Sequence, residues 1–172
     1  PNSLNQYITI RGDWLNNGTF VHNNFTVYFD GPSSQSISGN NIFHNLWINN
    51  GFGITLNSGI VVLGTLELSF GIINQNTHSI DFRTGSILFP AGVSNQAHTH
   101  NGHVTKWFNS TDSFTYPVGD GTNYRPITLT STTTNSNNMS AAYMFAAQNQ
   151  SSLNSSLSSI ETYGWDIQRS TG

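Results

Sequence analysis

Three histidines lie close together in the sequence, and imidazole is a common ligand of transition metals. They are His98, His100 and His103, in the segment His-Thr-His-Asn-Gly-His. Alternation along an extended strand would place His98 and His100 on one face. A structural zinc site normally has four ligands, and neither a cysteine nor a carboxylate lies near these histidines in the sequence. We therefore interpret the segment as a polar linker, and we predict neither a metal nor another cofactor.

The acidic residues do not form a pattern that predicts catalysis. Glycan hydrolysis needs two carboxylates that face each other across a cleft, whereas the 8 Asp and Glu residues are scattered along the chain. The 5 Lys and Arg residues do not cluster either, as the site of a polysaccharide lyase would require. We predict no catalytic residues.

The segment Gly-Asp-Gly-Thr-Asn offers oxygen ligands in a tight loop around Asp120. A calcium loop normally supplies several more carboxylates at fixed positions. We therefore interpret the segment as a glycine-containing hairpin turn, in which Arg125 pairs with Asp120.

Tryptophan side chains are the best candidates for contact with a ligand or partner. An exposed indole offers a flat apolar face and a hydrogen-bonding edge, which suit a sugar ring or a neighbouring subunit. Trp47 lies between Leu46 and Ile48, which alternation would point inward, so we expect Trp47 to point outward. Trp14 is a second candidate contact, although packing in a core or at a junction explains it better.

The composition excludes several classes of function. The 172 residues include no cysteine and only 8% charged residues, with a net charge of −3. A nucleic-acid binder would carry a basic stripe, and a chain without cysteine has no disulfides or thiolate metal sites. No apolar run reaches the roughly 20 residues of a membrane span. Because 35% of the residues are hydrophobic and 12% are aromatic, we expect the chain to fold.

Apolar triplets recur about every 20 residues in the first half of the chain: Phe25-Thr-Val27, Leu46-Trp-Ile48, Leu66-Glu-Leu68 and Ile87-Leu-Phe89. Short strand-like runs without helical periodicity indicate an all-β protein. A period of this length is typical of a solenoid, in which successive coils stack. We predict a short right-handed parallel β-helix of about 20 residues per coil over residues 1–93. A β-sandwich with evenly spaced strands is the alternative.

The repeat also predicts which side chains stack. The first residues of the triplets would lie above one another inside the coils: Phe25, Leu46, Leu66 and Ile87. The central residues would point outward: Thr26, Trp47, Glu67 and Leu88. Asn24 and Asn45 would stack as an amide ladder along the solenoid axis.

The repeat ends after Pro90-Ala-Gly92. Strand-like runs around Phe114–Val118 and Tyr124–Leu129, joined by a turn, predict antiparallel, β-sandwich-like strands over residues 94–160 that cap the solenoid. Residues 161–172 are predicted to begin a following strand or module.

Several segments resemble a repeat module of large secreted, adhesin-like surface proteins of Bacteroidetes-type bacteria. They include Gly12-Asp-Trp-Leu-Asn-Asn-Gly-Thr-Phe20, Phe114-Thr-Tyr-Pro-Val-Gly-Asp-Gly-Thr-Asn-Tyr-Arg-Pro126 and Tyr163-Gly-Trp-Asp-Ile-Gln-Arg169. The resemblance covers nearly the whole chain. It implies export by the type IX route and display at the cell surface, and it carries over no catalytic residues.

The preferred hypothesis is a non-catalytic extracellular module that forms part of a surface adhesin, stalk or filament. Its expected partners are further copies of itself or neighbouring modules of a longer protein. One alternative is a carbohydrate-binding module that binds surface glycans through exposed aromatic side chains. A second alternative is a polysaccharide-degrading β-helix enzyme.

Overall fold

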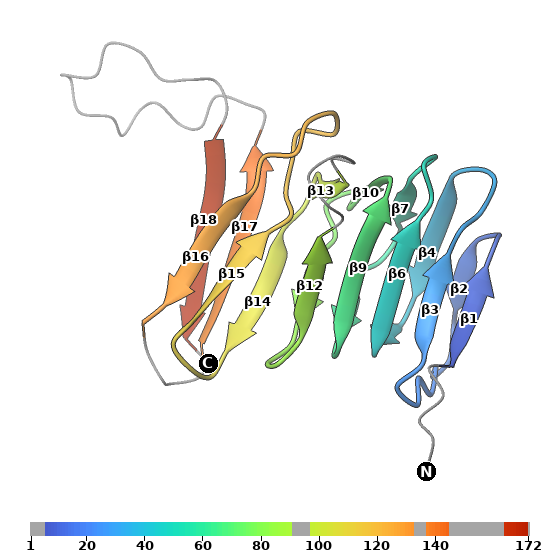
Figure 1. The fold of residues 1–172 in the computed structure, drawn as a ribbon, viewed down its shortest axis with the longest axis horizontal. Coiled ribbons are helices and arrows are strands. Elements are labelled where there is room, and N and C mark those ends of the chain that lie inside the picture. Colours follow the sequence, from blue (N-terminus) through green and yellow to red (C-terminus); the bar gives the residue numbers. More distant parts are fainter. Residues whose placement is uncertain (1–5, 91–96, 133–136, 145–163, 172) are drawn as a thin grey trace.

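The structure is a computed structural model that describes residues 6–90, 97–132, 137–144 and 164–171. These residues form 18 strands, most of which stand side by side along the long axis of the molecule (Figure 1). The described residues contain no helix, and hence none that could cross a membrane.

Three sheets run along the molecule. The first coil contributes one described strand to each of sheets A and B, and every later coil contributes one strand to each of the three sheets. Sheet A contains β1 (Tyr7–Ile10), β3 (Thr26–Phe29), β6 (Asn45–Asn49), β9 (Thr65–Phe70) and β12 (Ile87–Pro90). Sheet B contains β2 (Trp14–Asn16), β4 (Gln35–Gly39), β7 (Ile54–Leu56), β10 (Ile72–Asn74) and β13 (His98–His100). The parallel part of sheet C contains β5 (Asn41–Phe43), β8 (Ile60–Val62), β11 (Ile80–Phe82) and β14 (Val104–Phe108). The predicted β-solenoid is confirmed, and the sandwich alternative is wrong.

The predicted antiparallel strands follow the parallel coils. β15 (Asp112–Tyr116) and β16 (Ile127–Ser131) form a separate two-stranded sheet. β17 (Asn137–Met144) and β18 (Gly164–Thr171) extend sheet C with antiparallel pairing. Parallel pairing continues beyond residue 93, because β13 and β14 pair with β10 and β11 of the preceding coil.

The stacking register agrees with the sequence repeat in the middle of sheet A and differs at its start. Leu46 and Leu66 are paired as predicted. Val27 occupies the position predicted for Phe25, because it pairs with Leu46. A shift of two residues preserves the face of a strand, so Val27 is buried in the core and Thr26 still points outward.

The register at the last repeat differs by one residue. Leu88, rather than Ile87, pairs with Leu66. A shift of one residue moves every side chain to the other face, so Leu88 packs against the core while Ile87 is 51% exposed. The prediction that Leu88 points outward is therefore wrong. Its cause is a coil longer than the average period.

Buried amide side chains connect the coils at the corners between sheets. The Nε2 atom of Gln35 donates hydrogen bonds to the carbonyl oxygens of Ile10 (3.0 Å) and Gly12. Its Oε1 atom accepts from the Gly31 amide (2.9 Å) and from Asn50 Nδ2 (2.9 Å). These bonds give main-chain groups at the corner a side-chain partner, so the solenoid holds polar corners around an apolar interior.

The predicted amide ladder of Asn24 and Asn45 does not form. The Nδ2 atom of Asn45 donates instead to the main-chain carbonyl of Asn24 (3.5 Å), and its Oδ1 atom accepts from the Thr65 amide (2.9 Å). Asn24 has a φ of 61°, in the left-handed region, because it lies in the turn before β3. The asparagine bridges three coils through the main chain rather than through stacked side chains.

Candidate ligand-binding groove

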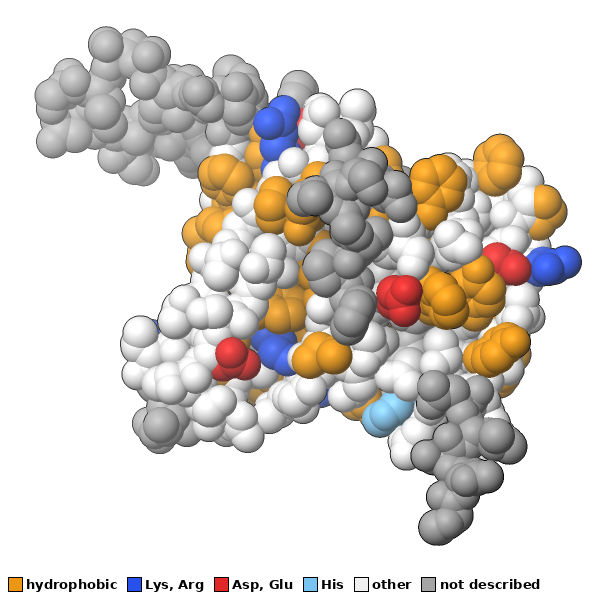
Figure 2. Space-filling model, in the orientation of Figure 1, with side chains coloured by type: hydrophobic (Ala, Val, Ile, Leu, Met, Phe, Trp, Pro, Cys, Tyr) orange, Lys and Arg blue, Asp and Glu red, His pale blue; other side chains and the backbone are white. Residues whose placement is uncertain are grey.

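The outer face of sheet A carries a groove of about 700 Å³. It crosses all five strands of the sheet, and its lining includes Tyr7, Thr26, Tyr28, Trp47, Glu67 and Ile87. Hydrophobic side chains gather on this face with an acidic side chain beside them (Figure 2). Four steps of about 4.8 Å between neighbouring strands give the groove a length of roughly 19 Å.

Strand pairing brings three outward side chains into one row across the groove. Tyr28 on β3 pairs with Trp47 on β6, which pairs with Glu67 on β9. The alternating burial of each strand points these three residues away from the core. The prediction that Trp47 points outward is thus confirmed, although the side chain is half-buried rather than fully exposed.

The two aromatic rings form one platform. Their centroids are 4.5 Å apart and the ring planes are inclined at 37°. The Nε1 atom of Trp47 donates to Ser69 Oγ (2.6 Å), and Ser69 Oγ donates to Glu67 Oε1 (2.9 Å). The Tyr28 hydroxyl accepts from Asn49 Nδ2 (2.6 Å). Because both polar ends of the platform are bonded, the rings are held in a fixed orientation.

Trp14 contributes to packing at the N-terminal end of the solenoid. Its ring lies 5.0 Å from Phe20 and 5.5 Å from Phe43, measured between ring centroids. Its Nε1 atom donates to Asn41 Oδ1 (2.9 Å). These contacts support the packing interpretation over a contact with an external ligand.

The histidine segment forms strand β13 and does not act as a linker. His98 is fully buried, and its Nε2 atom accepts a hydrogen bond from the Gly121 amide (3.2 Å). The ring of His100 lies 6.4 Å from that of His98, and burial lowers the pKa of His100 below its usual value. His103 faces another element, since its Nε2 atom is 3.0 Å from Asp166 Oδ2. The described residues contain no group of three His, Cys, Asp or Glu side chains that could hold a metal.

The predicted pair of Asp120 and Arg125 is present in the loop between β15 and β16. Arg125 Nε lies 3.4 Å from Asp120 Oδ2. The main-chain amide of Asn123 donates to the Asp120 carboxylate (2.6 Å), as does that of Thr122 (2.9 Å). These bonds hold the pKa of Asp120 well below its usual range, and the bond from the Asn123 amide has the largest effect. The carboxylate therefore organises a turn, as predicted.

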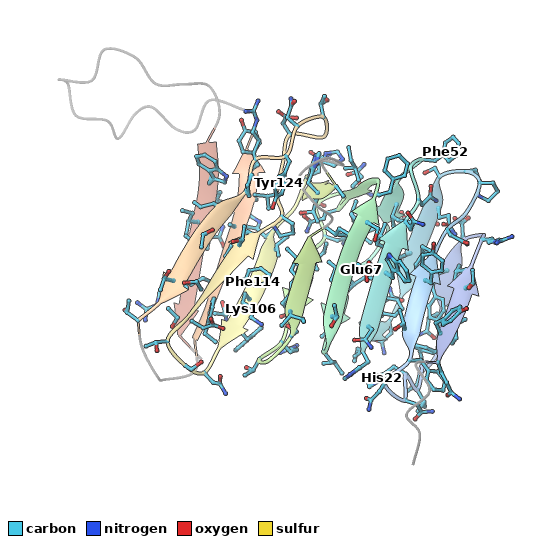
Figure 3. All side chains as sticks on the ribbon, viewed as in Figure 1. His22, Phe52, Glu67, Lys106, Phe114 and Tyr124 are labelled. Atoms are coloured by element: carbon cyan, nitrogen blue, oxygen red, sulfur yellow. The ribbon has the colours of Figure 1, made fainter. Side chains whose placement is uncertain are left out.

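Lys106 is a buried cation that the sequence did not reveal. It points inward from β14 and is only 4% exposed. Its Nζ atom donates to the carbonyl oxygens of Arg83 (3.2 Å) and Ser86 and lies 3.3 Å from Ser86 Oγ. It also lies 5.5 Å from the centre of the Phe114 ring. Figure 3 labels both residues. Burial lowers the pKa of Lys106, and the charge of Asp112 partly offsets this. The three bonds use all its protons, which indicates a structural role.

Sequence reasoning missed the partners of Trp47 in the groove. Tyr28 was not recognised because the predicted register aligned Thr26, rather than Tyr28, with Trp47. The correct signal is a spacing of one coil between Tyr28 and Trp47, together with alternating burial in both strands. Ser69 carried no signal of its own, because its role follows from the orientation of the indole.

No protein-family model matches the chain, no curated protein matches its sequence, and no solved structure matches its fold. The fold and the groove alone therefore define the class of protein, which is a β-solenoid with an aromatic groove on one outer sheet face.

Proposed function

We propose that the chain is a non-catalytic, extracellular adhesive module that binds glycans in the groove on sheet A. The observation that carries this proposal is the outward platform of Tyr28 and Trp47, fixed by hydrogen bonds to Asn49 and Ser69. A sugar ring has an apolar face that stacks on an aromatic ring and hydroxyl groups that bond to neighbouring polar groups. The groove provides both kinds of contact.

The length and shape of the groove favour a chain of sugar units over a single one. Tyr7 at one end is 68% exposed and Ile87 at the other is 51% exposed, so both ends are open to the surface. Thr26 and Thr65 add hydroxyl groups along the lining. A polysaccharide could therefore bind through an internal stretch of its chain, with both of its ends extending beyond the groove, as surface adhesion requires.

The acid–base groups of the groove favour binding without catalysis. Glu67 is the one carboxylate in its described lining, whereas a glycosidase uses two carboxylates about 5–10 Å apart. A polysaccharide lyase needs clustered cations, and the described lining contains no Lys, Arg or His. The described lining of the groove thus offers no arrangement that supports the enzyme alternative.

The proposal places the module in a longer surface protein exported by the type IX route. Its support is the resemblance of the sequence to repeat modules of Bacteroidetes-type adhesins and the solenoid fold. β5 and β18 are the two edges of sheet C among the described strands, and an edge strand can pair with another chain. Neighbouring modules or second copies would extend the sheets at such edges.

The test is binding of the purified chain to an array of polysaccharides, with Trp47→Ala and Trp107→Ala compared against the unmodified protein. Trp107 is the matched control because it is a half-buried, outward tryptophan on sheet C. We expect Trp47→Ala to weaken binding at least tenfold, as loss of a central aromatic contact does, and Trp107→Ala to leave it unchanged. Circular dichroism would verify that both variants fold. Absence of any glycan binding, or full binding by folded Trp47→Ala, would overturn the proposal.

A further inference from the structure

We infer that the groove takes polysaccharides without acidic groups, and that Glu67 is the residue that excludes glycans bearing carboxyl or sulfate groups. This inference rests on the proposed glycan binding and adds the chemical class of the ligand. It follows from where the only charge in the described lining lies and from what surrounds it.

Glu67 lies beside the place where a sugar ring would stack. It is paired directly with Trp47 on the adjacent strand, so its main chain is about 4.8 Å from that of the tryptophan. Figure 3 shows its side chain on the outer side of β9. Glu67 Oε1 is held by Ser69 Oγ (2.9 Å), which fixes the carboxylate near the indole. A ligand that stacks on Trp47 must therefore lie close to this negative charge.

No cation in the described lining offsets the charge of Glu67. Two cations outside the lining are engaged in contacts of their own. Arg11 pairs with Asp30 (3.3 Å), and Lys106 bonds to main-chain oxygens inside the solenoid. The whole chain carries a net charge of −3, so the field around the groove does not attract an anion either.

The size of the effect is large enough to set specificity. Two like charges about 5 Å apart at the effective dielectric of a protein surface repel strongly enough to weaken binding roughly tenfold or more. A neutral sugar has the opposite interaction, because its hydroxyl groups can donate to the carboxylate in charge-assisted hydrogen bonds. Glu67 thus favours neutral ligands and disfavours acidic ones through the same oxygen atoms.

The experiment compares two polymers that share a backbone and differ in charge. The probes are hydroxyethyl cellulose and carboxymethyl cellulose, with dextran and dextran sulfate as a second pair, and affinity electrophoresis measures binding. The proteins are the unmodified chain, Glu67→Gln and the control Asp13→Asn. The control removes the same charge from another face, where Asp13 Oδ1 accepts a hydrogen bond from the Ser36 amide (2.7 Å).

We expect the unmodified chain and Asp13→Asn to prefer the neutral polymer of a pair at least tenfold. Glu67→Gln should reduce this preference to about threefold or less, and high salt should reduce it in the unmodified chain, because salt screens surface charges. Equal or tighter binding of the acidic polymer, or an unchanged preference in Glu67→Gln, would overturn the inference while leaving glycan binding intact. If the unmodified chain binds no polysaccharide on the array or in either pair, glycan binding itself is wrong, and the inference fails with it.

Discussion

Two outward tryptophans on different sheets have opposite environments. Trp47 on sheet A lies beside Tyr28 in an open groove, with its indole N–H bonded to Ser69. Trp107 on sheet C has the guanidinium group of Arg83 over its ring, 5.3 Å from the ring centre. Strand alternation is the same in both places, yet only one ring presents a surface to a groove. The neighbour on the adjacent coil thus decides whether an outward aromatic side chain stays open to a groove or is covered by another side chain.

The cation on sheet C is itself held in position. Arg83 lies 3.3 Å from the carboxylate of Asp81 on the same coil, so the guanidinium group contacts a carboxylate and a ring at once. On the preceding coil, the corresponding neighbour of Trp47 is Tyr28, which joins it in the aromatic platform. On the following coil its neighbour is Glu67, whose negative charge is not attracted to the face of an aromatic ring. This difference is why we propose sheet A as the binding face, and we refer to sheet C, where Arg83 lies over Trp107, as the closed face.

The largest effect is expected at Lys106, which lies on β14 next to Trp107 and supports the closed face from inside. Lys106→Met would remove the Lys106 donor from the Ser86 carbonyl oxygen and one of several donors from the Arg83 carbonyl oxygen, which Ser86 N and Ser86 Oγ also reach. The expected cost is about 1–3 kcal/mol in the free energy of unfolding. Urea unfolding at pH 7 measures this change. Glycan binding by the folded variant should be unaffected, and a loss of binding without a loss of stability would contradict the separation of the two faces.

Lys106 also predicts a dependence of stability on pH. Burial lowers the pKa of its ammonium group in the folded state, so the unfolded chain binds more protons between that lowered pKa and the usual lysine value of about 10.4. Stability contributed by this group should therefore rise with pH through that window, fall as the pH drops through it, and stay constant at pH values below the lowered pKa. The difference in unfolding free energy between the unmodified chain and Lys106→Met should show this rise, and a constant difference would contradict it.

A smaller effect is expected at Ser69, which fixes the open face. Ser69→Ala removes the acceptor of the Trp47 indole and the donor to Glu67. A net hydrogen bond contributes about 0.5–1.5 kcal/mol, so glycan affinity should fall roughly three- to tenfold in calorimetric titrations. The control is Ser38→Ala on sheet B, where the Ser38 hydroxyl accepts from Asn57 Nδ2 (3.1 Å). Equal losses in both variants would show that the platform needs no fixed orientation.

The smallest effect is expected when the cation over Trp107 is removed. Arg83→Ala should change the free energy of unfolding by less than about 1 kcal/mol, because partly exposed cation–π contacts and ion pairs contribute little. Acrylamide should quench Trp107 fluorescence more strongly in this variant, measured in a background in which Trp14, Trp47 and Trp165 are replaced by phenylalanine. Glycan binding in the otherwise unmodified protein should not increase, since an uncovered ring alone does not make a groove.

The sequence predicts the solenoid well and its details less well. The recurring triplets at Leu46 and Leu66 were sufficient to identify stacked coils, and alternation was sufficient to place Trp47 outside. The prediction failed for Leu88 because the last coil is longer than the others, which moves its side chains to the opposite face of the strand. The apolar repeat does not determine the lengths of the turns, so it could not reveal this change. The burial of His98 depends on a loop that returns more than twenty residues later, which no local pattern reveals.

The groove was harder to predict than the fold. Trp47 was recognised, but its platform requires the correct pairing of Tyr28, and an error of two residues concealed it. Covering of Trp107 by Arg83 is a contact between successive coils, so it also depends on the register. Sequence periodicity predicts the average length of a coil. Which outward side chains become neighbours depends on how far each coil differs from that average.

The most direct test follows the indole N–H signals of the four tryptophans in a nitrogen-15 spectrum during titration with the neutral oligosaccharide that binds best on the array. Substitution of each tryptophan by phenylalanine assigns the four signals. The account predicts that the Trp47 signal shifts as the sugar saturates the groove, while those of Trp14, Trp107 and Trp165 stay in place. A shift of the Trp107 signal with an unmoved Trp47 signal would contradict it.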